Sequence, residues 1–548
     1  MTTADLIALS DDIEEWARAC AFRSSDDIPR LRRTPGWMPD ITPESVEKRR
    51  ADVAAFRARL DTVTGDLDAQ DVAAQVDARL LASVLNRAVW DLDVLRNWER
   101  DAVFLVGQIL GPWFDLLLPL PPYSGEVERG LVAVASAIPA RVGLSRDNLS
   151  RAGVADLARV ASIELQDIDA RFAASVEGLD GVVSGETLAE LRALAPAAGE
   201  ALAGFGSWLA SSAADFAPSV PVGRDRFVWF LRNVAFIADE PEDLVRAAQQ
   251  DYRRAVLAEL VTRNRFRDLP ADEIAASIDA QVERQVAQEA EVRAFSDREG
   301  LLTQPDTLRR YHVAEMPPRI EPLRFLGVPD DLTDQDRLDV DGVSYMPRPR
   351  PDLPYFYAAN ARDPRLGIIH EGAHYKQLAL SWAHPDPLRR RYVDSVANEG
   401  IAFYNEELML LAGLFDDAPH SQEVVHNFNR LRSLRVVVDI NLATGAFTLE
   451  EAVDFFVSLV PMDVETAREE CAMYLATPGL AMSYHVGKQA LLRLVTDAIV
   501  AQGDAFSLRA LHDRVWANGN VPFSLQRWEI LGDRGDLDVI ERSSAPLS

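Results

Sequence analysis

Apolar residues recur at helical spacing through most of the first 220 residues. This periodicity indicates packed α-helices, because residues three and four positions apart lie on the same face of a helix. The segment 77–106 is an example, since its apolar positions form one stripe: Leu80, Leu81, Val84, Leu85, Val89, Leu92 and Leu95. The sequence therefore predicts a mainly α-helical fold.

A break in the helical pattern divides the chain. Residues 215–227 contain Pro218 and Pro221, and proline interrupts helices. We therefore expect an N-terminal helical lobe over residues 1–220 and a C-terminal lobe over residues 221–548. The alternative is that both parts form one continuous domain.

Two further stretches have helical signals. Between Ala271 and about Phe295 apolar residues repeat every four positions, which predicts a long amphipathic helix packed on the core. These residues are Ile274, Ile278, Val282 and Val286. The most apolar stretch, residues 102–123, is interrupted by Gln, Asp and two prolines, so we expect a buried helix and a Pro-rich turn, not a membrane span.

The residue composition describes a folded, acidic protein. Hydrophobic residues make up 48% of the 548 positions and charged residues 26%, as in globular proteins. The formal charge of -29 repels nucleic acids and anionic membranes, so neither is an expected partner. The two cysteines, Cys20 and Cys471, lie far apart, and the first residues lack a secretory pattern, which predicts a cytoplasmic location. The sequence leaves the oligomeric state open.

Residues 317–364 differ from the helical segments because proline is concentrated there. Within them, the stretches GVSYM (342–346) and PYFYA (354–358) favour strands. The sequence predicts a small sheet with a proline-marked edge, immediately before the motif at residues 370–374.

This segment also offers candidate substrate contacts. An edge strand over residues 353–360 could pair with an extended peptide through main-chain groups, with Tyr355 and Tyr357 on one face. An aromatic strand packed on the core is an equally good alternative. Three nearby arginines could bind a substrate carboxylate, although surface arginines are commoner than such clamps. They are Arg348, Arg350 and Arg362.

The stretch GIIHEGAHYKQ, residues 367–377, contains a His-Glu-x-x-His motif. Asp363 followed by Pro364 predicts a helix start, with Asp as the cap and Pro at the first helical position. The motif should therefore lie on a helix that continues to Trp382.

On such a helix His370 and His374 are neighbours on one face, and their ring nitrogens could bind the same Zn²⁺ ion. Glu371 is then placed to act as the general base that takes a proton from water. Two core histidines satisfied by hydrogen bonds are the structural alternative. Two imidazoles and one carboxylate with an open position favour zinc over manganese or cobalt.

A zinc hydrolase needs a third protein ligand and leaves the fourth position to water. Glu399 follows His374 by 25 residues, which allows a loop and an antiparallel return, and it begins a second helical stretch. We therefore expect Glu399 to be the third ligand. Glu406 and Glu407 are the alternatives, but lone carboxylates on a helix are more often solvated.

Three segments resemble the bacterial family called domain of unknown function 885, whose members look like zinc metallopeptidases of the gluzincin kind. These segments are HEGAHYKQ (370–377), NEGIAFYNEEL (398–408) and YLATPGLAMSYHVGK (474–488). The spacing of the first two also resembles the oligopeptidase and peptidyl-dipeptidase group. The resemblance implies a zincin-like, two-lobed helical fold with a small sheet beside the active-site helix. It also implies zinc ligands at His370, His374 and Glu399, with Glu371 as the base.

The same resemblance points to a residue that stabilises the reaction intermediate. Tyr484 could donate a hydrogen bond to the oxyanion, which needs a preorganised donor opposite the metal. The adjacent His485 is the alternative donor. A buried tyrosine with a satisfied hydroxyl is the structural explanation for Tyr484.

The sequence departs from the family pattern at several positions. Many members have a longer His-Glu-x-x-Pro-Gly-His-His form, so helix geometry is the better argument for the second ligand here. Leu480, Met473 and the region of Ala443 stand where the family commonly has Gln, Arg and His, which affects substrate contacts more than metal binding. Arg435 and Asp439 match the family, and at a spacing of four they are most simply a structural ion pair.

Three hypotheses about function follow from these residues. The first is a zinc-dependent metallopeptidase that cleaves short peptides in a channel between helical lobes. The second keeps the metal but acts on a small-molecule amide or in biosynthesis. The third is a helical scaffold without activity, and the intact Glu371 argues against it because its loss would be the simplest sign of a dead site.

Overall fold

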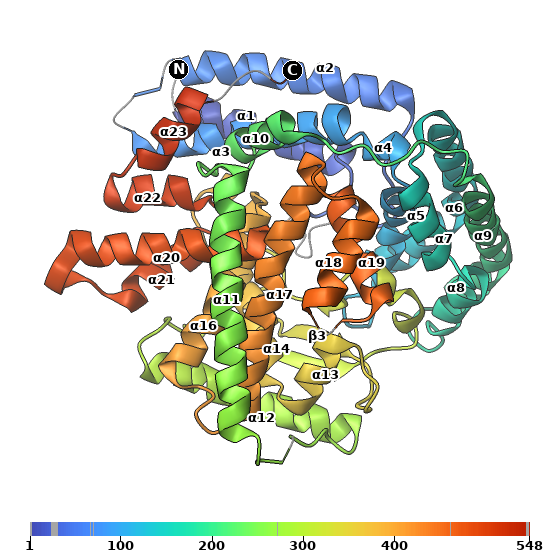
Figure 1. The fold of residues 1–548 in the computed structure, drawn as a ribbon. Coiled ribbons are helices and arrows are strands. Elements are labelled where there is room, and N and C mark those ends of the chain that lie inside the picture. Colours follow the sequence, from blue (N-terminus) through green and yellow to red (C-terminus); the bar gives the residue numbers. More distant parts are fainter. Residues whose placement is uncertain are drawn as a thin grey trace.

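The computed structural model describes residues 3–23, 31–65, 67–68, 71–270, 272–460, 462–543 and 547. The predicted mainly helical fold is confirmed over these residues (Figure 1). The helices before residue 220 are α1 (Thr3–Cys20), α2 (Pro43–Gly65), α3 (Val72–Val89), the π-helix η1 (Trp90–Leu95), α4 (Asn97–Arg100), α5 (Ala102–Leu117), α6 (Gly125–Ala152), α7 (Ala155–Glu164), α8 (Ile168–Glu177) and α9 (Gly185–Ser212).

The second part of the chain contains the strands and the remaining helices. The first of these elements are α10 (Arg224–Asn233), α11 (Pro241–Phe266), α12 (Ile278–Arg298), β1 (Tyr311–Glu315), the 3-10 helix η2 (Glu321–Leu326), β2 (Asp330–Asp331), β3 (Gly342–Met346), α13 (Tyr355–Arg362) and α14 (Arg365–Ser381). They are followed by α15 (Pro387–Arg391), α16 (Ser395–Ala412), α17 (Pro419–Thr444), α18 (Leu449–Leu459), α19 (Val464–Ala476), α20 (Ser483–Gln502), η3 (Gly503–Ala505), α21 (Leu508–Ala517), α22 (Phe523–Leu531) and α23 (Gly535–Ser543).

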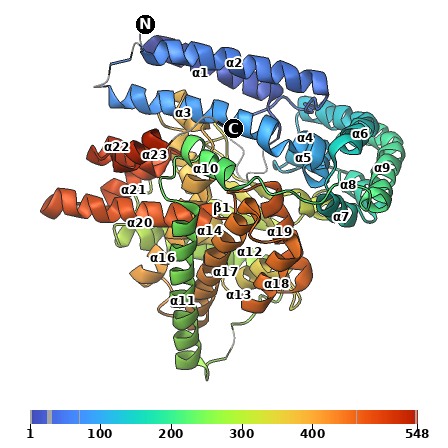
Figure 2. The same cartoon turned by 45° about the horizontal axis from the view of Figure 1, so that its top comes forward.

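Hydrophobic cores connect the parts of the chain on either side of residue 220. The core of α5 to α9 also includes Ile320, Val343 and Tyr345, so this bundle packs on the region of the sheet. A second core joins α1 to α3 with Leu525 of α22 and Leu537 of α23. Figure 2 shows α22 and α23 beside α3, at the face opposite the lower end of α11.

A three-stranded sheet lies next to the motif helix, in the order β1-β3-β2. The prediction of a strand at residues 342–346 is confirmed, since they form β3, parallel to β1 and antiparallel to β2. The outer edge of β1 is covered by α12, because the Gln285 amide donates to the carbonyl of Tyr311 and accepts from the amide of Val313. Because the strand order is β1-β3-β2, the short strand β2 forms the other edge of the sheet.

The prediction of a strand at residues 354–358 is wrong, because the chain forms helix α13 from Tyr355 onward. Pro354 fixes the backbone before the first turn, and the alanines that follow favour a helix. The rings of Tyr355 and Phe356 both pack on Phe428 of α17 at 5.6 and 5.3 Å between ring centroids. Peptide binding by strand addition at residues 353–360 is therefore excluded.

The amphipathic helix predicted from Ala271 is present but begins later and buries another face. Helix α12 starts at Ile278, and Ala271 lies outside the described residues. Its buried face contains Gln281, Gln285 and Glu289, while Val286 of the apolar stripe is 40% exposed. This polar face is buried because Gln285 pairs with backbone groups at the edge of β1, and Glu289 forms ion pairs with Arg293 and Arg310.

The apolar stretch from residue 102 forms a buried helix, α5, followed by a turn, as predicted. None of the helices within the described ranges is both long enough and apolar enough to cross a membrane.

Candidate metal centre

Helix α14 carries the His-Glu-x-x-His motif and begins as the sequence predicts. The carboxylate of Asp363 accepts the backbone N–H of Arg365 at 3.0 Å, which caps the first turn. His370 and His374 are 7% and 3% exposed, and their rings lie 5.0 Å apart at an angle of 89°. One turn of the helix therefore places both imidazoles on one buried face.

Helix α16 packs against α14 and brings Glu399 to the two histidines. Its Oε2 atom lies 3.5 Å from Nε2 of His370 and 3.4 Å from Nε2 of His374. One possible ligand atom from each of these residues lies within 4.8 Å of the other two. Ligand atoms about 2.0 to 2.1 Å from a tetrahedral zinc are separated from each other by about 3.4 Å. The observed spacing therefore fits such an ion.

The remaining ring nitrogens are engaged on the far side of the imidazoles. Nδ1 of His370 lies 2.6 Å from Oε1 of Glu406 and 3.3 Å from Nη2 of Arg432, and Nδ1 of His374 lies 3.2 Å from Oδ1 of Asn398. If both Nδ1 atoms donate to these oxygens, both Nε2 atoms are acceptors available to a metal. Oε2 of Glu399 is buried and faces the two Nε2 atoms at 3.4 and 3.5 Å, which is longer than an ordinary hydrogen bond. Two imidazoles and one carboxylate are a ligand set that zinc sites with an open fourth position use.

Glu406 was a candidate ligand and supports His370 instead. It is 1% exposed, so the expectation that it is solvated is wrong. Arg432 of α17 lies 2.9 Å from its Oε1 and balances its charge, and the Arg432 guanidinium keeps the pKa of Glu406 below its usual range against the effect of burial. Four aromatic rings surround this guanidinium within 6 Å: those of Phe356, Phe403, Phe428 and Tyr484.

The second alternative ligand, Glu407, points away from the histidines. Its carboxylate forms an ion pair with Lys488 at 2.8 Å and is 37% exposed.

The pKa of His370 depends on its charged neighbours. Burial and the Arg432 charge lower this pKa, but Glu399 and Glu406 outweigh them and raise it to about 9. The two carboxylates therefore favour a positive charge at this position, which a bound metal ion would supply in place of a proton.

Helices α16 and α20 cross in direct backbone contact, which fixes Glu399 relative to Tyr484. A Cβ atom on Gly487 would lie 1.9 Å from the carbonyl oxygen of Val396, and one on Gly400 would lie 2.5 Å from the Cα of Gly487. Only glycine fits at such a crossing.

The two candidate oxyanion donors have different environments. The ring of Tyr484 lies nearly parallel to that of His370, with 6.1 Å between centroids and 12° between planes. His485 faces the other way, because its Nε2 lies 2.8 Å from Oδ2 of Asp251 on α11. The structure therefore brings Tyr484, and not His485, next to the histidine pair.

Asp330 lies at the edge of the sheet near Glu371, and none of the sequence motifs points to it. The hydroxyl of Tyr311 donates to its Oδ2 at 3.1 Å, and Tyr311 packs near Gly372 of the motif helix. Burial and the charge of Glu371 raise the pKa of Asp330 above its usual range. A two-residue strand has no pattern that would reveal this carboxylate. Asn398 could have been found, since it is adjacent to Glu399.

Other sequence expectations are corrected by the contacts. Arg435 and Asp439 do not pair with each other, although they lie one turn apart on α17. Arg435 binds Glu470 of α19 through two hydrogen bonds of 2.9 and 3.1 Å. Asp439 accepts the backbone N–H groups of Gly479 and Met482 at 2.9 Å each. Each of the two side chains therefore binds a partner from another element and not its neighbour one turn away on α17.

The three arginines proposed as substrate clamps have local partners. Arg348 pairs with Glu315, and Arg350 with Asp352. Arg362 donates to a carbonyl of its own helix.

Comparisons with known proteins describe the fold and the family. A comparison with curated proteins gives no match. Two solved structures share the fold over nearly the whole chain. A candidate lipoprotein of unknown function from Shewanella oneidensis has a TM-score of 0.70 and 17% identity, and the match covers 97% of this chain and 100% of that one. A candidate lipoprotein from Colwellia psychrerythraea has a TM-score of 0.74 and 16% identity, covering 99% and 100%.

The family model described as "bacterial protein of unknown function (DUF885)" matches residues 31–530. This range contains all the candidate metal ligands and the elements that support them. The chain belongs to the DUF885 family of bacterial proteins.

Proposed function

We propose that this protein is a zinc-dependent hydrolase, and specifically a metallopeptidase that cleaves short peptides. The observation that carries the proposal is the spacing of 3.4 to 3.5 Å between Oε2 of Glu399 and the two Nε2 atoms of His370 and His374. Both contacts are longer than an ordinary hydrogen bond, whereas buried polar groups that serve only the core are usually paired at hydrogen-bond distance.

The side chains around this position have complementary roles in the proposed reaction. A bound zinc ion would polarise the scissile carbonyl and make the attacking water more acidic. Glu371 takes the proton from that water and passes it to the leaving amine. Tyr484 donates a hydrogen bond to the oxygen of the tetrahedral intermediate. Glu406 and Asn398 fix the orientation of the two imidazoles.

We also propose that the fold is of the zincin kind, similar to oligopeptidases. Three features support this assignment: a mixed sheet next to the motif helix, a second helix that supplies the carboxylate, and a mainly helical surround. In this assignment, the motif helix α14 and the adjacent sheet form the part of the fold that carries the reaction.

Metal analysis by plasma mass spectrometry tests the ligand set. We expect one zinc per chain in the native protein, and loss of the metal in His370→Ala and in Glu399→Ala. Glu407→Ala is the matched control on the same helix and should keep the metal. If the zinc-supplemented native protein holds none after excess metal is removed, the histidine pair belongs to the core and the proposal fails.

Cleavage of a mixed peptide library by mass spectrometry tests the reaction. Glu371→Gln should keep its zinc and lose activity by a factor of about 100 to 10,000, because it removes the proton acceptor but no ligand. A zinc-loaded native protein that cleaves no peptide would contradict the peptidase assignment and leave a small-molecule amide as the substrate. Unchanged cleavage in Glu371→Gln would contradict the role of this base.

A further inference from the structure

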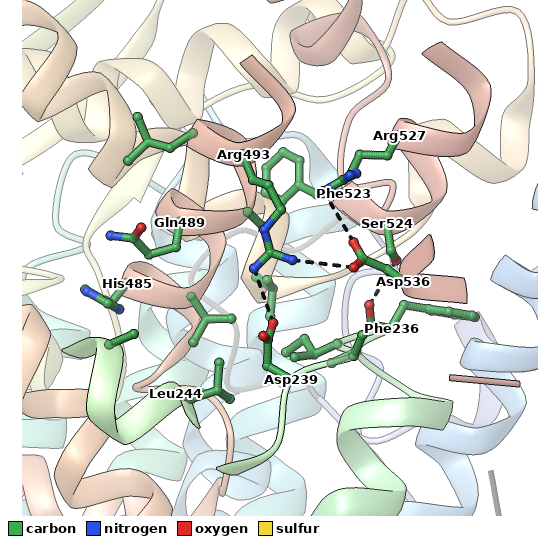
Figure 3. A pocket seen from close by; sticks show the side chains of 18 of the residues that line it. Phe236, Asp239, Leu244, His485, Gln489, Arg493, Phe523, Ser524, Arg527 and Asp536 are labelled. Atoms are coloured by element: carbon green, nitrogen blue, oxygen red, sulfur yellow. Dashed lines mark hydrogen bonds and ion pairs between the residues drawn. The ribbon is translucent and has the colours of Figure 1, made fainter. Parts of the chain in front are cut away.

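A pocket lies against helices α16 and α20, and none of the candidate metal ligands lines it. Its volume is about 370 Å³, which is in the range of small-molecule sites. Val396 of α16 and His485 of α20 line it, whereas Glu399 and Tyr484 do not. Figure 3 shows the pocket between the segment that precedes α11 and the helices α20 and α22. The pocket is therefore separate from the proposed reaction site.

The floor of the pocket is apolar and buried. Leu244, Val396, Val486 and Phe523 line it and are between 3% and 7% exposed. Such a floor accepts the hydrocarbon part of a ligand and excludes water from it.

One wall of the pocket is held in a conformation that ordinary loops avoid. Phe236 has a φ of 53°, which is unfavourable for a bulky side chain. The hydroxyl of Ser524 donates to its carbonyl at 2.9 Å. Arg232 is 1% exposed and donates to the carbonyls of Ile237 and Asp239. Strained backbone fixed in this way is common where a binding site is formed in advance.

The rim of the pocket carries charges of both signs. Arg493 extends between Asp239 and Asp536 (Figure 3) and lies 3.4 Å from a carboxylate oxygen of each. Charge-assisted hydrogen bonds are usually about 2.7 to 2.9 Å long. The Arg493 guanidinium and the two carboxylates are therefore only loosely paired, and their side chains keep exposures of 42%, 38% and 25%. Arg527 also lines the pocket and lies 3.8 Å from Asp536 (Figure 3).

We propose that this pocket binds a free apolar α-amino acid, or a dipeptide of apolar residues, as a zwitterion. The ligand carboxylate accepts hydrogen bonds from Arg493, and the ligand ammonium donates to Asp239 and Asp536. The apolar side chain packs on the floor next to Val486 and Phe523. An anion alone would be repelled by Asp239 and Asp536, and a cation alone by Arg493 and Arg527, so a zwitterion matches the rim.

The position of the pocket links the ligand to the crossing of α16 and α20. Val396 lies three residues before Glu399, and Val486 lies next to Gly487 at the crossing. A ligand that contacts both helices stabilises the arrangement that holds Glu399. This proposal does not depend on peptidase activity, because the pocket contains none of the candidate zinc ligands.

Isothermal titration calorimetry of the full chain with leucine and phenylalanine tests the proposal. The titrations use His370→Ala, so that binding at the metal centre does not contribute. We expect saturable binding of one ligand per chain. N-acetylleucine, which lacks the ammonium, and leucinamide, which lacks the carboxylate, should each bind about tenfold more weakly or worse.

Two variants locate the binding. Arg493→Gln should weaken leucine binding about tenfold or more. Arg534→Gln should not, although Arg534 also lies between two carboxylates, Asp538 and Glu541. Ala247→Trp places a bulky ring at the rim without changing a charge, and it should abolish binding even if Arg493→Gln folds poorly.

Several results would overturn the proposal. Equal binding of leucine and leucinamide indicates a cation site, and equal binding of leucine and N-acetylleucine indicates an anion site. Absence of saturable binding by leucine and phenylalanine, or full binding by Ala247→Trp, excludes this pocket as an amino-acid site.

Discussion

At the scale of single residues, the candidate centre depends on groups that do not touch the proposed metal. Each imidazole has one nitrogen near Glu399 and the other near an oxygen of α16, in Glu406 or Asn398. Glu406 lies seven positions after Glu399, so two turns of one helix supply both a ligand and its support. Helix α16 therefore supplies Glu399 beside the Nε2 atoms and Glu406 beside Nδ1 of His370.

The role of Glu406 leads to a prediction about metal affinity. Glu406→Gln should weaken zinc binding about 10- to 100-fold, because a neutral amide holds the His370 imidazole less strongly. Competition with a chromogenic chelator measures the affinity. Glu407→Gln, one residue along the same helix, is the control and should bind zinc as the native protein does. An unchanged affinity in Glu406→Gln would show that this carboxylate does not orient the ligand.

At the scale of elements, the crossing of α16 and α20 determines how accurately Glu399 and Tyr484 are placed. The crossing has no room for a Cβ atom on Gly487, since the nearest atom is a backbone oxygen and cannot rotate away. Any side chain there must move one helix as a whole, because backbone packed in a core has little freedom to adjust.

We therefore predict that Gly487→Ala destabilises the protein by about 1 to 3 kcal/mol and lowers its zinc content. Chemical denaturation measures the first effect and plasma mass spectrometry the second. Gly204→Ala in α9 is the matched control, because nothing lies within 4 Å of its added methyl group. That variant should gain about 0.5 to 1 kcal/mol. If both variants behave alike, the crossing does not position the site.

Elements differ in how far the sequence predicts them. Helix α14 and its start at Asp363 follow from local signals, namely a cap, a proline and an uninterrupted pattern. Helix α13 was not predicted, because aromatic residues favour strands unless a partner such as Phe428 selects a helix. The buried polar face of α12 was missed for a related reason, since the unpaired edge of β1 decides which side is buried.

The candidate site divides in the same way. The histidine pair, Glu371 and Glu399 follow from spacing along the chain and from the family resemblance. Arg432 and Asp330 come from α17 and β2, and only folding brings them to the site. Spacing along the chain identifies groups on two successive long helices, α14 and α16, but it does not relate the motif to α17 or β2.

At the scale of the whole molecule, three acidic residues lie near one another at the junction between the two parts of the chain. Glu164 ends α7 in the N-terminal part, Asp101 caps α5, and Glu469 lies on α19. Burial and then the charges of Asp101 and Glu469 raise the pKa of Glu164 from 4.5 to about 8. Glu164 therefore keeps its proton in the folded protein at a pH where the unfolded chain releases it.

This difference in proton binding predicts how stability changes with pH. Between about pH 5 and 8 the folded state binds more protons than the unfolded state at Glu164, so the free energy of unfolding falls as the pH rises. One pKa unit corresponds to about 1.4 kcal/mol. Because Glu164 is only partly shielded from solvent, we expect a loss of about 1 to 2 kcal/mol over this range.

Glu164→Gln tests this prediction, because an amide has no proton to lose. Denaturation in urea at pH 5, 6, 7 and 8 gives the free energy of unfolding of each protein. The variant should lose less stability than the native protein as the pH rises, by about 1 to 2 kcal/mol at pH 8. Glu190→Gln, at an exposed position on α9, should follow the native profile. Parallel profiles for Glu164→Gln and the native protein would show that Glu164 is ionised in the fold, and that the junction tolerates all three charges.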